Sequence, residues 1–333
     1  MERLGSRPVR VIWSGVRSQT HVVYAASWLR QLLATTTGPI TLVDLGVGGF
    51  LGKNPVTPAD LERLLPRDDR MRRIRATGKR DLVALDHEQR IYLATGAPGI
   101  KPWLRTLAAQ PSTPIRVVVT DEGIGSYGSW QTRRDAWRRE GGSEPWTSVR
   151  AVAVATANQV LTSERWSLYR QRSGRWTVVE PVAAEFRRHR IPGRSSTAVF
   201  LSQPWVELGV LTDAQFRAHV GQVAEQVTAA GWDFAVRPHP AEDETRFAGF
   251  EVLPGFTPAE LDLRVTSARA VLGATSTALL NLKAIFGVPA IRLTTPELAR
   301  LDSGLGRHQR SLLDSYLPPA VEARDLPDAL HAL

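Results

Sequence analysis

Short apolar runs rich in valine, isoleucine and leucine alternate with amphipathic segments along almost the whole chain. The apolar runs have the length of buried strands, and the segments between them carry apolar residues at helical spacing. This alternation is typical of βαβ units, in which helices cover both faces of a parallel sheet. The pattern therefore predicts an α/β protein built on parallel sheets.

Two successive series of strands and helices are expected, one in each half of the chain. In the first half the expected strands span residues 9–13, 40–45, 82–85, 91–94, 115–120, 151–155 and 160–162, and the expected helices span 20–33, 58–65 and 102–109. In the second half the strands are expected at 198–202, 234–237, 270–272 and 290–292, and the helices at 213–230, 276–286 and 326–333. Between the two series, residues 187–196 combine arginine, proline, glycine and serine, which is typical of a linker.

We therefore expect an N-terminal Rossmann-like domain over residues 1–190, a C-terminal Rossmann-like domain over 191–318 and a helical tail over 319–333. The length of 333 residues allows two domains of about 150 residues each. Open parallel sheets bind ligands at the carboxyl ends of their strands. The two domains are accordingly expected to face each other across a ligand-binding cleft.

Composition supports a folded protein, since 43% of the residues are hydrophobic and 23% are charged. No apolar stretch approaches the ~20 residues that a membrane helix needs, and the first ten residues lack the apolar stretch of a secretory signal. The absence of cysteine excludes disulfides, thiolate metal sites and a cysteine nucleophile. We expect a cytoplasmic location, with a peripheral association with a membrane left open.

The formal net charge is +9, and only four of the 42 basic residues are lysines. A GC-rich genome explains an excess of arginine, while a positive surface that attracts an anionic partner stays open as a second explanation. The densest basic segment, residues 67–80, is expected to be a solvated loop. No basic-aromatic repeat or known nucleic-acid motif is present, so we expect no nucleic-acid partner.

Three loops that follow predicted strands carry the residues best suited to chemistry. The first contains Asp121, Glu122 and Gly123, directly after the strand 115–120. A carboxylate held at the end of a buried strand can act as a general base, although aspartate and glycine are also ordinary turn residues. The sequence therefore offers Asp121 as a candidate base, with a surface turn as the alternative.

The second loop contains Arg237 and the histidine of the sequence Pro-His-Pro, His239, followed by Pro240. The prolines hold His239 on a stiff backbone, from which the ring can donate a hydrogen bond or a proton to a phosphate or a leaving group. Arg237 would add a donor that is always charged. A capping or packing role for His239 is the alternative.

The third loop contains Gly273 and the hydroxyl residues Thr275, Ser276 and Thr277 at the start of an expected helix. A helix N-terminus with nearby hydroxyl groups binds anions, although serine and threonine are also preferred there simply as N-caps. The glycines match neither a phosphate loop nor a dinucleotide fingerprint, which disfavours an NTPase or an NAD enzyme. A carboxylate in one half and two anion-binding loops in the other predict transfer from a phosphate-activated donor to a hydroxyl.

In this order, the three motifs resemble those of bacterial sialyltransferases and polysialyltransferases of GT-B fold. Residues 120–127 (TDEGIGSY) are similar to the acidic segment of that family, and His239-Pro240 is similar to its His-Pro motif. Residues 199–204 (VFLSQP) look like the strand that opens its C-terminal domain. The resemblance runs through most of the chain in order, but it is carried by a few short motifs.

The resemblance implies an inverting, metal-independent glycosyltransferase that moves sialic acid or a related nonulosonic acid from a CMP-activated donor to an acceptor hydroxyl. Asp121 would be the general base, and His239 would stabilise the leaving phosphate. The residues implied for the donor are Arg237, Pro240, Gly273, Thr275, Ser276, Thr277 and Gln203. No cofactor and no metal are expected, since the CMP-sugar is a co-substrate. A CMP-Kdo or other nucleotide-sugar transferase of GT-B fold, or a non-catalytic nucleotide-binding protein of that fold, are the alternatives.

The acceptor is expected to be a glycan, a lipid-linked glycan or a small natural product. The residues offered for its side of the site are Gln19, His21, Glu122, Gly123 and Tyr127. Trp130 could add a stacking surface, and residues 302–308, with His308, are expected to form a mobile loop beside the cleft.

Overall fold

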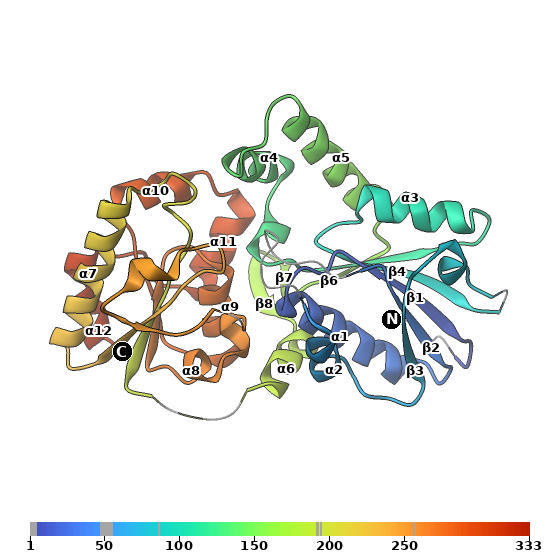
Figure 1. Cartoon of the computed structure of the whole chain (residues 1–333), viewed down its shortest axis with the longest axis horizontal. Helices are drawn as coiled ribbons and strands as arrows, with labels where there is room; N and C mark the ends of the chain where they lie inside the picture. Colours follow the sequence, from blue (N-terminus) through green and yellow to red (C-terminus); the bar gives the residue numbers. More distant parts are fainter. Residues whose placement is uncertain (1–4, 47–55, 86, 191–192, 194, 256) are drawn as a thin grey trace. The chain divides into compact units, whose positions relative to one another are not determined.

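The computed structural model describes residues 5–46, 56–85, 87–190, 193, 195–255 and 257–333, and divides the chain into two compact units (Figure 1). Unit 1 comprises Met1–Arg134, Gly142–Arg170 and Val179–Glu185, and unit 2 comprises Asp135–Gly141, Gln171–Val178 and Phe186–Leu333. This division differs from a single boundary at residue 190, because two short segments of the first half belong to unit 2. That the two domains face each other across a cleft stays a prediction.

Unit 1 is built on a six-stranded parallel sheet with the strand order β3-β2-β1-β4-β5-β6. Its strands are β1 (Val9–Ser14), β2 (Ile40–Asp44), β3 (Met71–Arg75), β4 (Gln89–Thr95), β5 (Arg116–Thr120) and β6 (Glu164–Trp166). Its helices are α1 (Gln19–Thr35), α2 (Pro58–Leu64), α3 (Ile100–Ala109), α5 (Trp146–Leu161) and most of α6 (Glu180–Arg188), and α4 (Trp130–Arg139) begins in it. The chain starts in the middle of the sheet and winds outward to each edge in turn, which is the Rossmann arrangement.

The central strand β1 shows why the apolar runs form this sheet. Val11, Ile12 and Trp13 are all fully buried, because helices cover both faces and leave no face for polar side chains. The helices begin where the sequence provides caps: Ser18 accepts the N–H of His21 at the start of α1. The order of the strands reverses between β1 and β4, so the loops after these strands flank the switch point of the sheet.

Unit 2 is built on a five-stranded parallel sheet with the strand order β11-β10-β9-β12-β13. Its strands are β9 (Thr197–Leu201), β10 (Asp233–Arg237), β11 (Glu251–Val252), β12 (Ala270–Gly273) and β13 (Ala290–Arg292). Its helices are α7 (Asp213–Ala229), α8 (Leu263–Thr266), α9 (Thr277–Phe286), α10 (Pro296–Ser303), α11 (Arg307–Tyr316) and α12 (Leu326–His331). The switch point of this sheet lies between β9 and β12.

The helical tail expected over residues 319–333 is part of unit 2 instead of a separate element. Helix α12 packs against α7 (Figure 1), and Leu326 and Leu330 are buried in the core that also holds Phe216 and Val223.

A hairpin of β7 (Tyr169–Arg172) and β8 (Arg175–Val178) forms a separate two-stranded sheet. No helix in the described part of the chain combines the length and apolar character that a membrane crossing requires.

Several expected elements are wrong, and each error has a physical cause. Residues 151–155 and 160–161 belong to the helix α5, which ends at Leu161, because alternating alanine and valine imitates strand periodicity while alanine favours helix. Residues 82–85 form no strand, since Leu82 ends the short 3₁₀ helix η1 (Lys79–Leu82). Residues 302–308 are not a long loop, because α10 ends at Ser303 and α11 begins at Arg307.

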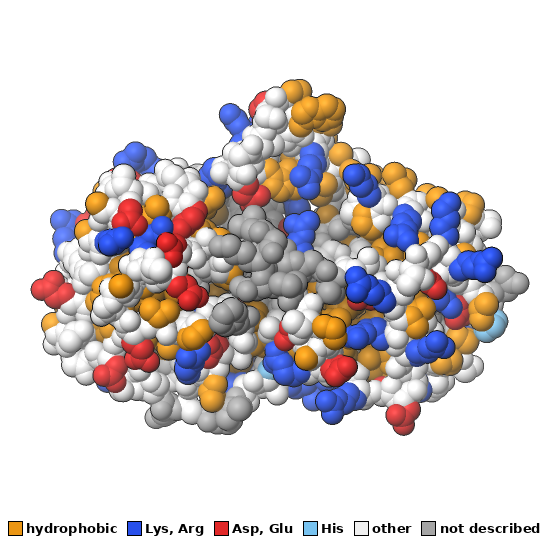
Figure 2. All heavy atoms as spheres, in the orientation of Figure 1, with side chains coloured by type: hydrophobic (Ala, Val, Ile, Leu, Met, Phe, Trp, Pro, Cys, Tyr) orange, Lys and Arg blue, Asp and Glu red, His pale blue; other side chains and the backbone are white. Residues whose placement is uncertain are grey.

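The basic segment 67–80 is also not a simple loop, because it contains the edge strand β3. Three exposed arginines, Arg72, Arg73 and Arg75, cover this edge, and charged side chains are a common means of keeping edge strands from pairing with other chains. On the face drawn in Figure 2, basic side chains are spread over the right-hand part of the molecule. Of the predicted linker, Arg187 and Arg188 end helix α6, and residues 191, 192 and 194 lie outside the described residues.

Candidate active site

Asp121 lies at the carboxyl end of β5 in unit 1, where the strand delivers it as predicted. Its side chain is buried, with 1% of the residue exposed. The Tyr127 hydroxyl donates a hydrogen bond to Oδ2, and the Leu168 N–H donates to the same oxygen at 2.8 Å. The other oxygen, Oδ1, is buried and has no hydrogen-bond partner among the described residues. The carboxylate is thus held by one oxygen, while the second retains its capacity to accept a proton.

Burial raises the pKa of Asp121 to about 6, and the hydrogen bonds from Tyr127 and Leu168 oppose this rise. Burial and the neighbouring carboxylate raise the pKa of Tyr127 well above its usual value, so Tyr127 remains a protonated donor. Asp121 is therefore ionised at neutral pH and is more basic than an exposed aspartate. Both properties suit a general base.

The loop after Asp121 is shaped by two glycines. Gly123 has a φ of 111°, a left-handed conformation that favours glycine. Gly96, which follows the neighbouring strand β4 and lies beside the Glu122 carboxylate, has a φ of 73° and is likewise in a conformation that favours glycine. Glu122 itself pairs with Arg133 at 3.1 Å and is exposed, and its backbone N–H donates to Ser126. These contacts give Glu122 a part in holding the loop.

His21 lies beside the same loop, whereas Gln19 is engaged elsewhere. Burial and the nearby charge of Arg17 lower the pKa of His21 to about 4, although contacts with the backbone of Glu122 and Gly15 act in the opposite direction. The ring is therefore neutral, and its Nδ1 accepts the Arg17 N–H at 3.2 Å. The Gln19 Oε1 accepts a hydrogen bond from Arg63 of α2 at 2.9 Å. The structure thus brings His21, Glu122, Gly123 and Tyr127 together around Asp121.

In unit 2, His239 lies in a tight turn after β10. Its backbone N–H donates to Glu242 Oε2 at 2.6 Å, and its Nδ1 accepts the Ala241 N–H at 3.2 Å. Because Nδ1 is an acceptor, the neutral ring carries its proton on Nε2. Burial lowers the pKa of His239 to about 4, with the charge of Glu207 opposing it. The neutral ring can therefore donate a hydrogen bond from Nε2 at neutral pH. Of the two predicted roles, donating a hydrogen bond is thus favoured over transferring a proton.

Glu242 is a residue that the sequence prediction missed. It is buried, its Oε1 accepts the Ser202 hydroxyl at 2.7 Å, and burial raises its pKa to about 7. A glutamate three residues after the histidine of a Pro-His-Pro turn was the available signal, since that spacing lets a side chain reach back to the turn's first N–H. Glu242 thereby closes the turn that presents His239.

The loop after β9 connects to the loop after β12. Gln203 donates from Nε2 to the Thr275 carbonyl at 3.0 Å, and its Oε1 is buried without a partner among the described residues. The Thr275 hydroxyl donates to Asp302 at 2.6 Å, and Asp302 also pairs with Arg292 at 2.7 Å. A Cβ on Gly273 would lie 3.1 Å from the carbonyl of Leu201, so glycine allows β12 to lie this close to β9. These loops flank the switch point of the sheet, where Rossmann-like units bind ligands.

Ser276 is the N-cap of α9, since its hydroxyl oxygen accepts the Leu279 N–H at 3.0 Å. Thr277 is the first residue of this helix, and Pro240 belongs to the turn after His239. The capping role does not remove the anion-binding character of the helix N-terminus, because the N–H groups of the first turn still point toward the edge of the sheet. The carboxyl edge of unit 2 thus gathers His239, Pro240, Gln203, Gly273, Thr275, Ser276 and Thr277.

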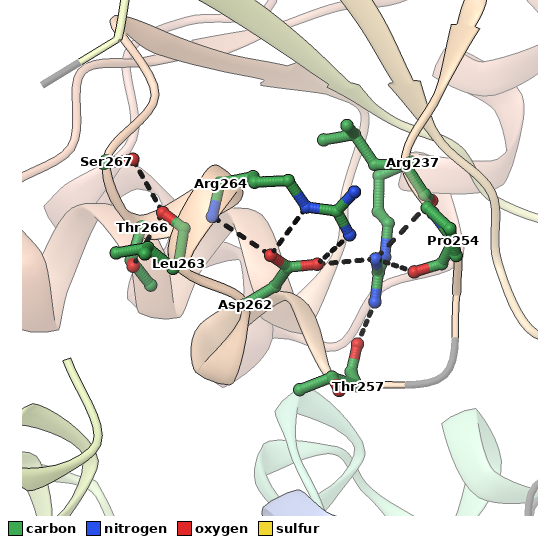
Figure 3. Close-up of polar contacts among 9 residues, drawn as sticks. Arg237, Pro254, Thr257, Asp262, Leu263, Arg264, Thr266 and Ser267 are labelled. Carbon is green, nitrogen blue, oxygen red and sulfur yellow. Dashed lines mark hydrogen bonds and ion pairs between the residues drawn. The ribbon is translucent and has the colours of Figure 1, made fainter. Parts of the chain in front are cut away.

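Arg237, predicted as a donor to the phosphate, is held by contacts inside unit 2. It is 5% exposed, its guanidinium pairs with Asp262 at 2.8 Å, and it donates to the carbonyls of Pro254 and Thr257 (Figure 3). Asp262 is shared with Arg264 at 3.0 Å. These contacts direct the guanidinium into the unit, where Arg237 holds the chain after β11, and a contact with the phosphate stays a prediction.

Trp130 and His308, the remaining residues offered by the sequence, each contact another side chain. Arg134 lies over the Trp130 ring at 5.6 Å, so this indole is already stacked on a guanidinium. The His308 ring lies edge-on to Trp176, with ring centroids 6.4 Å apart. Within the described residues, no group of three or more histidines, aspartates or glutamates could hold a metal ion, and independence from metal stays a prediction.

Comparison with solved structures identifies the class of fold. Medicago truncatula UGT71G1 complexed with UDP-glucose has a TM-score of 0.51 and 9% identity, covering 98% of this chain and 89% of that chain. Heptosyltransferase WaaC of E. coli with ADP (TM-score 0.45, 13% identity, 97% and 99% covered) and the GT-B domain of a sialyltransferase from Photobacterium damselae (0.46, 10%, 94% and 100%) are also similar. At these identities such likeness concerns the fold alone, and the two Rossmann-like units define a GT-B-like protein.

A family model matches part of the second half of the sequence. Residues 177–295 match the model of the alpha-2,8-polysialyltransferase (POLYST) family. No curated protein sequence matches the chain. The matched residues include His239 and the hydroxyl cluster at Ser276, so the predicted resemblance to a polysialyltransferase family is confirmed over this region. Family and fold together support a nucleotide-sugar glycosyltransferase.

Proposed function

We propose that the protein transfers sialic acid or a related nonulosonic acid from a CMP-activated donor to an acceptor hydroxyl, with inversion and without a metal. The observation that carries this proposal is Asp121, a buried carboxylate whose Oδ2 is hydrogen-bonded and whose Oδ1 has no partner among the described residues. Its pKa of about 6 makes it an effective base for a hydroxyl near neutral pH. The family match over residues 177–295 supports the sugar class.

In the proposed reaction, Asp121 Oδ1 takes the proton of the acceptor hydroxyl as the acceptor oxygen bonds to the anomeric carbon of the donor. The bond from that carbon to the phosphate oxygen breaks, and CMP leaves with the bonding electrons. Attack opposite to the leaving group inverts the anomeric configuration. Asp121 ends the step protonated and returns its proton to water.

The leaving phosphate gains negative charge, which neutral and dipolar donors of unit 2 can stabilise. The His239 Nε2–H is one such donor, and the N–H groups at the start of α9, capped by Ser276, are others. By analogy with oxyanion-hole donors, the loss of one such contact costs roughly 2.7–4 kcal/mol, or about 100- to 1000-fold in rate. The neutral state of His239 means that this stabilisation persists throughout the neutral pH range.

The donor assignment is tested by thermal shift with CMP, UDP, GDP and ADP on the purified protein. We expect CMP to raise the melting temperature most, and we expect His239→Ala to weaken this effect. His331→Ala is the matched control, because His331 is an exposed histidine at the end of α12. Stabilisation by UDP or ADP and not by CMP would contradict the donor assignment, and equal CMP responses of His239→Ala and the control would contradict the role of His239.

A further inference from the structure

Glu242 is a buried carboxylate that the proposed reaction does not use. It is 6% exposed, and both of its oxygens accept hydrogen bonds, one from the Ser202 hydroxyl at 2.7 Å and one from the His239 N–H at 2.6 Å. In the described part of the chain it forms no ion pair with a lysine or arginine. Its surroundings contain the charges of Glu207, which raises its pKa, and of Arg246, which lowers it.

A buried carboxylate without a cationic partner is unfavourable for folding because its charge loses hydration, and the same burial raises the pKa of Glu242 to about 7. An apolar residue of similar size would avoid this desolvation cost. Residues that disagree with local folding preferences are found most often at functional sites. The position of Glu242 beside His239 therefore calls for an explanation that involves the site.

The contacts of Glu242 determine how the His239 ring is presented. The Glu242 N–H donates to the His239 carbonyl at 2.9 Å while its side chain accepts the His239 N–H, so both ends of the turn are closed by one residue. The closed turn places the Ala241 N–H against Nδ1 of the ring. That contact keeps the ring proton on Nε2, the nitrogen that we assign to the phosphate.

Glu242 also connects the His239 turn to the neighbouring loops. Ser202, which donates to Glu242, follows β9 directly, and the next residue, Gln203, donates to the Thr275 carbonyl. Thr275 precedes Ser276, the N-cap of α9. A continuous series of hydrogen bonds and adjacent residues therefore joins the two groups that would receive the phosphate charge, the His239 ring and the α9 N-terminus.

We propose that Glu242 is the positioning residue of the donor site: through its hydrogen bonds to His239 and Ser202 it fixes the His239 ring, with its proton on Nε2, relative to the loop that begins α9. The inference rests on the proposed function for its effect on transfer, while its effect on the His239 ring can be observed without any substrate. Glutamine can perform the same task, because its carbonyl can accept the His239 N–H and its amide can donate to the Ser202 oxygen. Alanine cannot.

The test compares Glu242→Gln and Glu242→Ala with Glu225→Ala, an exposed glutamate of α7, as control. Histidine ring nitrogen shifts are measured by NMR without ligand, and kcat and KM for the CMP-sugar are measured at saturating acceptor. We expect the Nε2–H form of His239 in the wild type and in Glu242→Gln, and a mixture of forms in Glu242→Ala. We expect kcat/KM for the donor to fall roughly 10- to 100-fold in Glu242→Ala and to stay within about threefold of wild type in Glu242→Gln.

An unchanged His239 tautomer and unchanged kcat/KM in Glu242→Ala would overturn the inference. An equal loss in Glu242→Gln would also overturn it, because charge and not hydrogen bonding would then be the required property. If Glu242→Ala does not fold, Ser202→Ala replaces it, with an altered His239 signal expected and an unaltered one contradicting the link. If the wild type shows the Nε2–H form but does not use any CMP-sugar, the proposed function is contradicted. The positioning of His239 by Glu242 is then decided by the NMR comparison of the variants alone.

Discussion

Replacement of Tyr127 by phenylalanine tests how the base is tuned, because it removes only the hydroxyl that donates to Asp121 Oδ2. The ring keeps its edge-on contact with Tyr169, whose centroid lies 5.9 Å away. Asp121 then retains the hydrogen bond from the Leu168 N–H, at 2.8 Å. The variant should fold, with a small loss of stability because the Tyr169 N–H also loses the Tyr127 oxygen as its acceptor.

The size of the effect follows from the hydrogen bond that is lost. A hydrogen bond to a charged group contributes roughly 1.5–3 kcal/mol, and one pKa unit corresponds to about 1.36 kcal/mol. The bond favours the ionised form of Asp121, so its loss should raise the pKa of Asp121 by roughly 1–2 units from its value of about 6. A general base acts when it is deprotonated, so the acid limb of activity must move to higher pH by the same amount.

The assay is the pH profile of kcat/KM for the acceptor at saturating donor. We expect an acid limb near pH 6 in the wild type and a limb displaced upward in Tyr127→Phe, with activity recovered at alkaline pH. Tyr316→Phe, in α11 of unit 2, is the matched control and should leave the limb in place. An unshifted limb in Tyr127→Phe, or a loss that is equal at every pH, would refute the reasoning that Tyr127 tunes the base.

Two further predictions concern residues whose roles the structure defines. Arg237→Lys keeps the positive charge but loses the contacts with the Pro254 and Thr257 carbonyls, so the melting temperature should fall clearly. An unchanged melting temperature together with weakened CMP binding would instead indicate that Arg237 binds the phosphate. His219 is buried in the core, and burial lowers its pKa to about 4. Below pH 6.5 the unfolded chain therefore binds a proton at His219 more readily than the folded chain does. The free energy of unfolding should fall for this reason as the pH is lowered from 6.5 toward 4. Urea unfolding should show the wild type losing up to about 3 kcal/mol more than His219→Leu between pH 7 and 4, and parallel losses would contradict this assignment.

Sequence patterns located the strands that carry the site because buried parallel strands are continuous apolar runs. The strand before Asp121 and the strand before His239 are such runs, and both candidate residues lie at the carboxyl ends where the pattern placed them. The edge strand β3 was missed because its arginines hide the apolar signal, and α5 was misassigned because alternating alanine and valine fits both periods.

The partners of the site residues were less accessible from the sequence. Arg237 adjoins the Pro-His-Pro turn, but adjacency does not tell whether a long side chain points to the ligand edge or, as here, to Asp262. Ser202 and Glu242 are separated by 40 residues, and only the pairing of β9 with β10 brings them together. The Leu168 N–H reaches Asp121 from 47 residues away. Contacts of this kind depend on tertiary register, which a local pattern does not contain.

The central claim is tested most directly by transfer from a panel of nucleotide-activated sugars to an acceptor, with wild type and Asp121→Asn compared. The account predicts that the wild type releases CMP from a CMP-activated sugar acid and forms a product of inverted anomeric configuration. Asp121→Asn should keep the fold and CMP binding but lose transfer by roughly 100- to 10,000-fold. Turnover of a UDP-, GDP- or ADP-sugar in place of the CMP-sugar, or full transfer by Asp121→Asn, would contradict it.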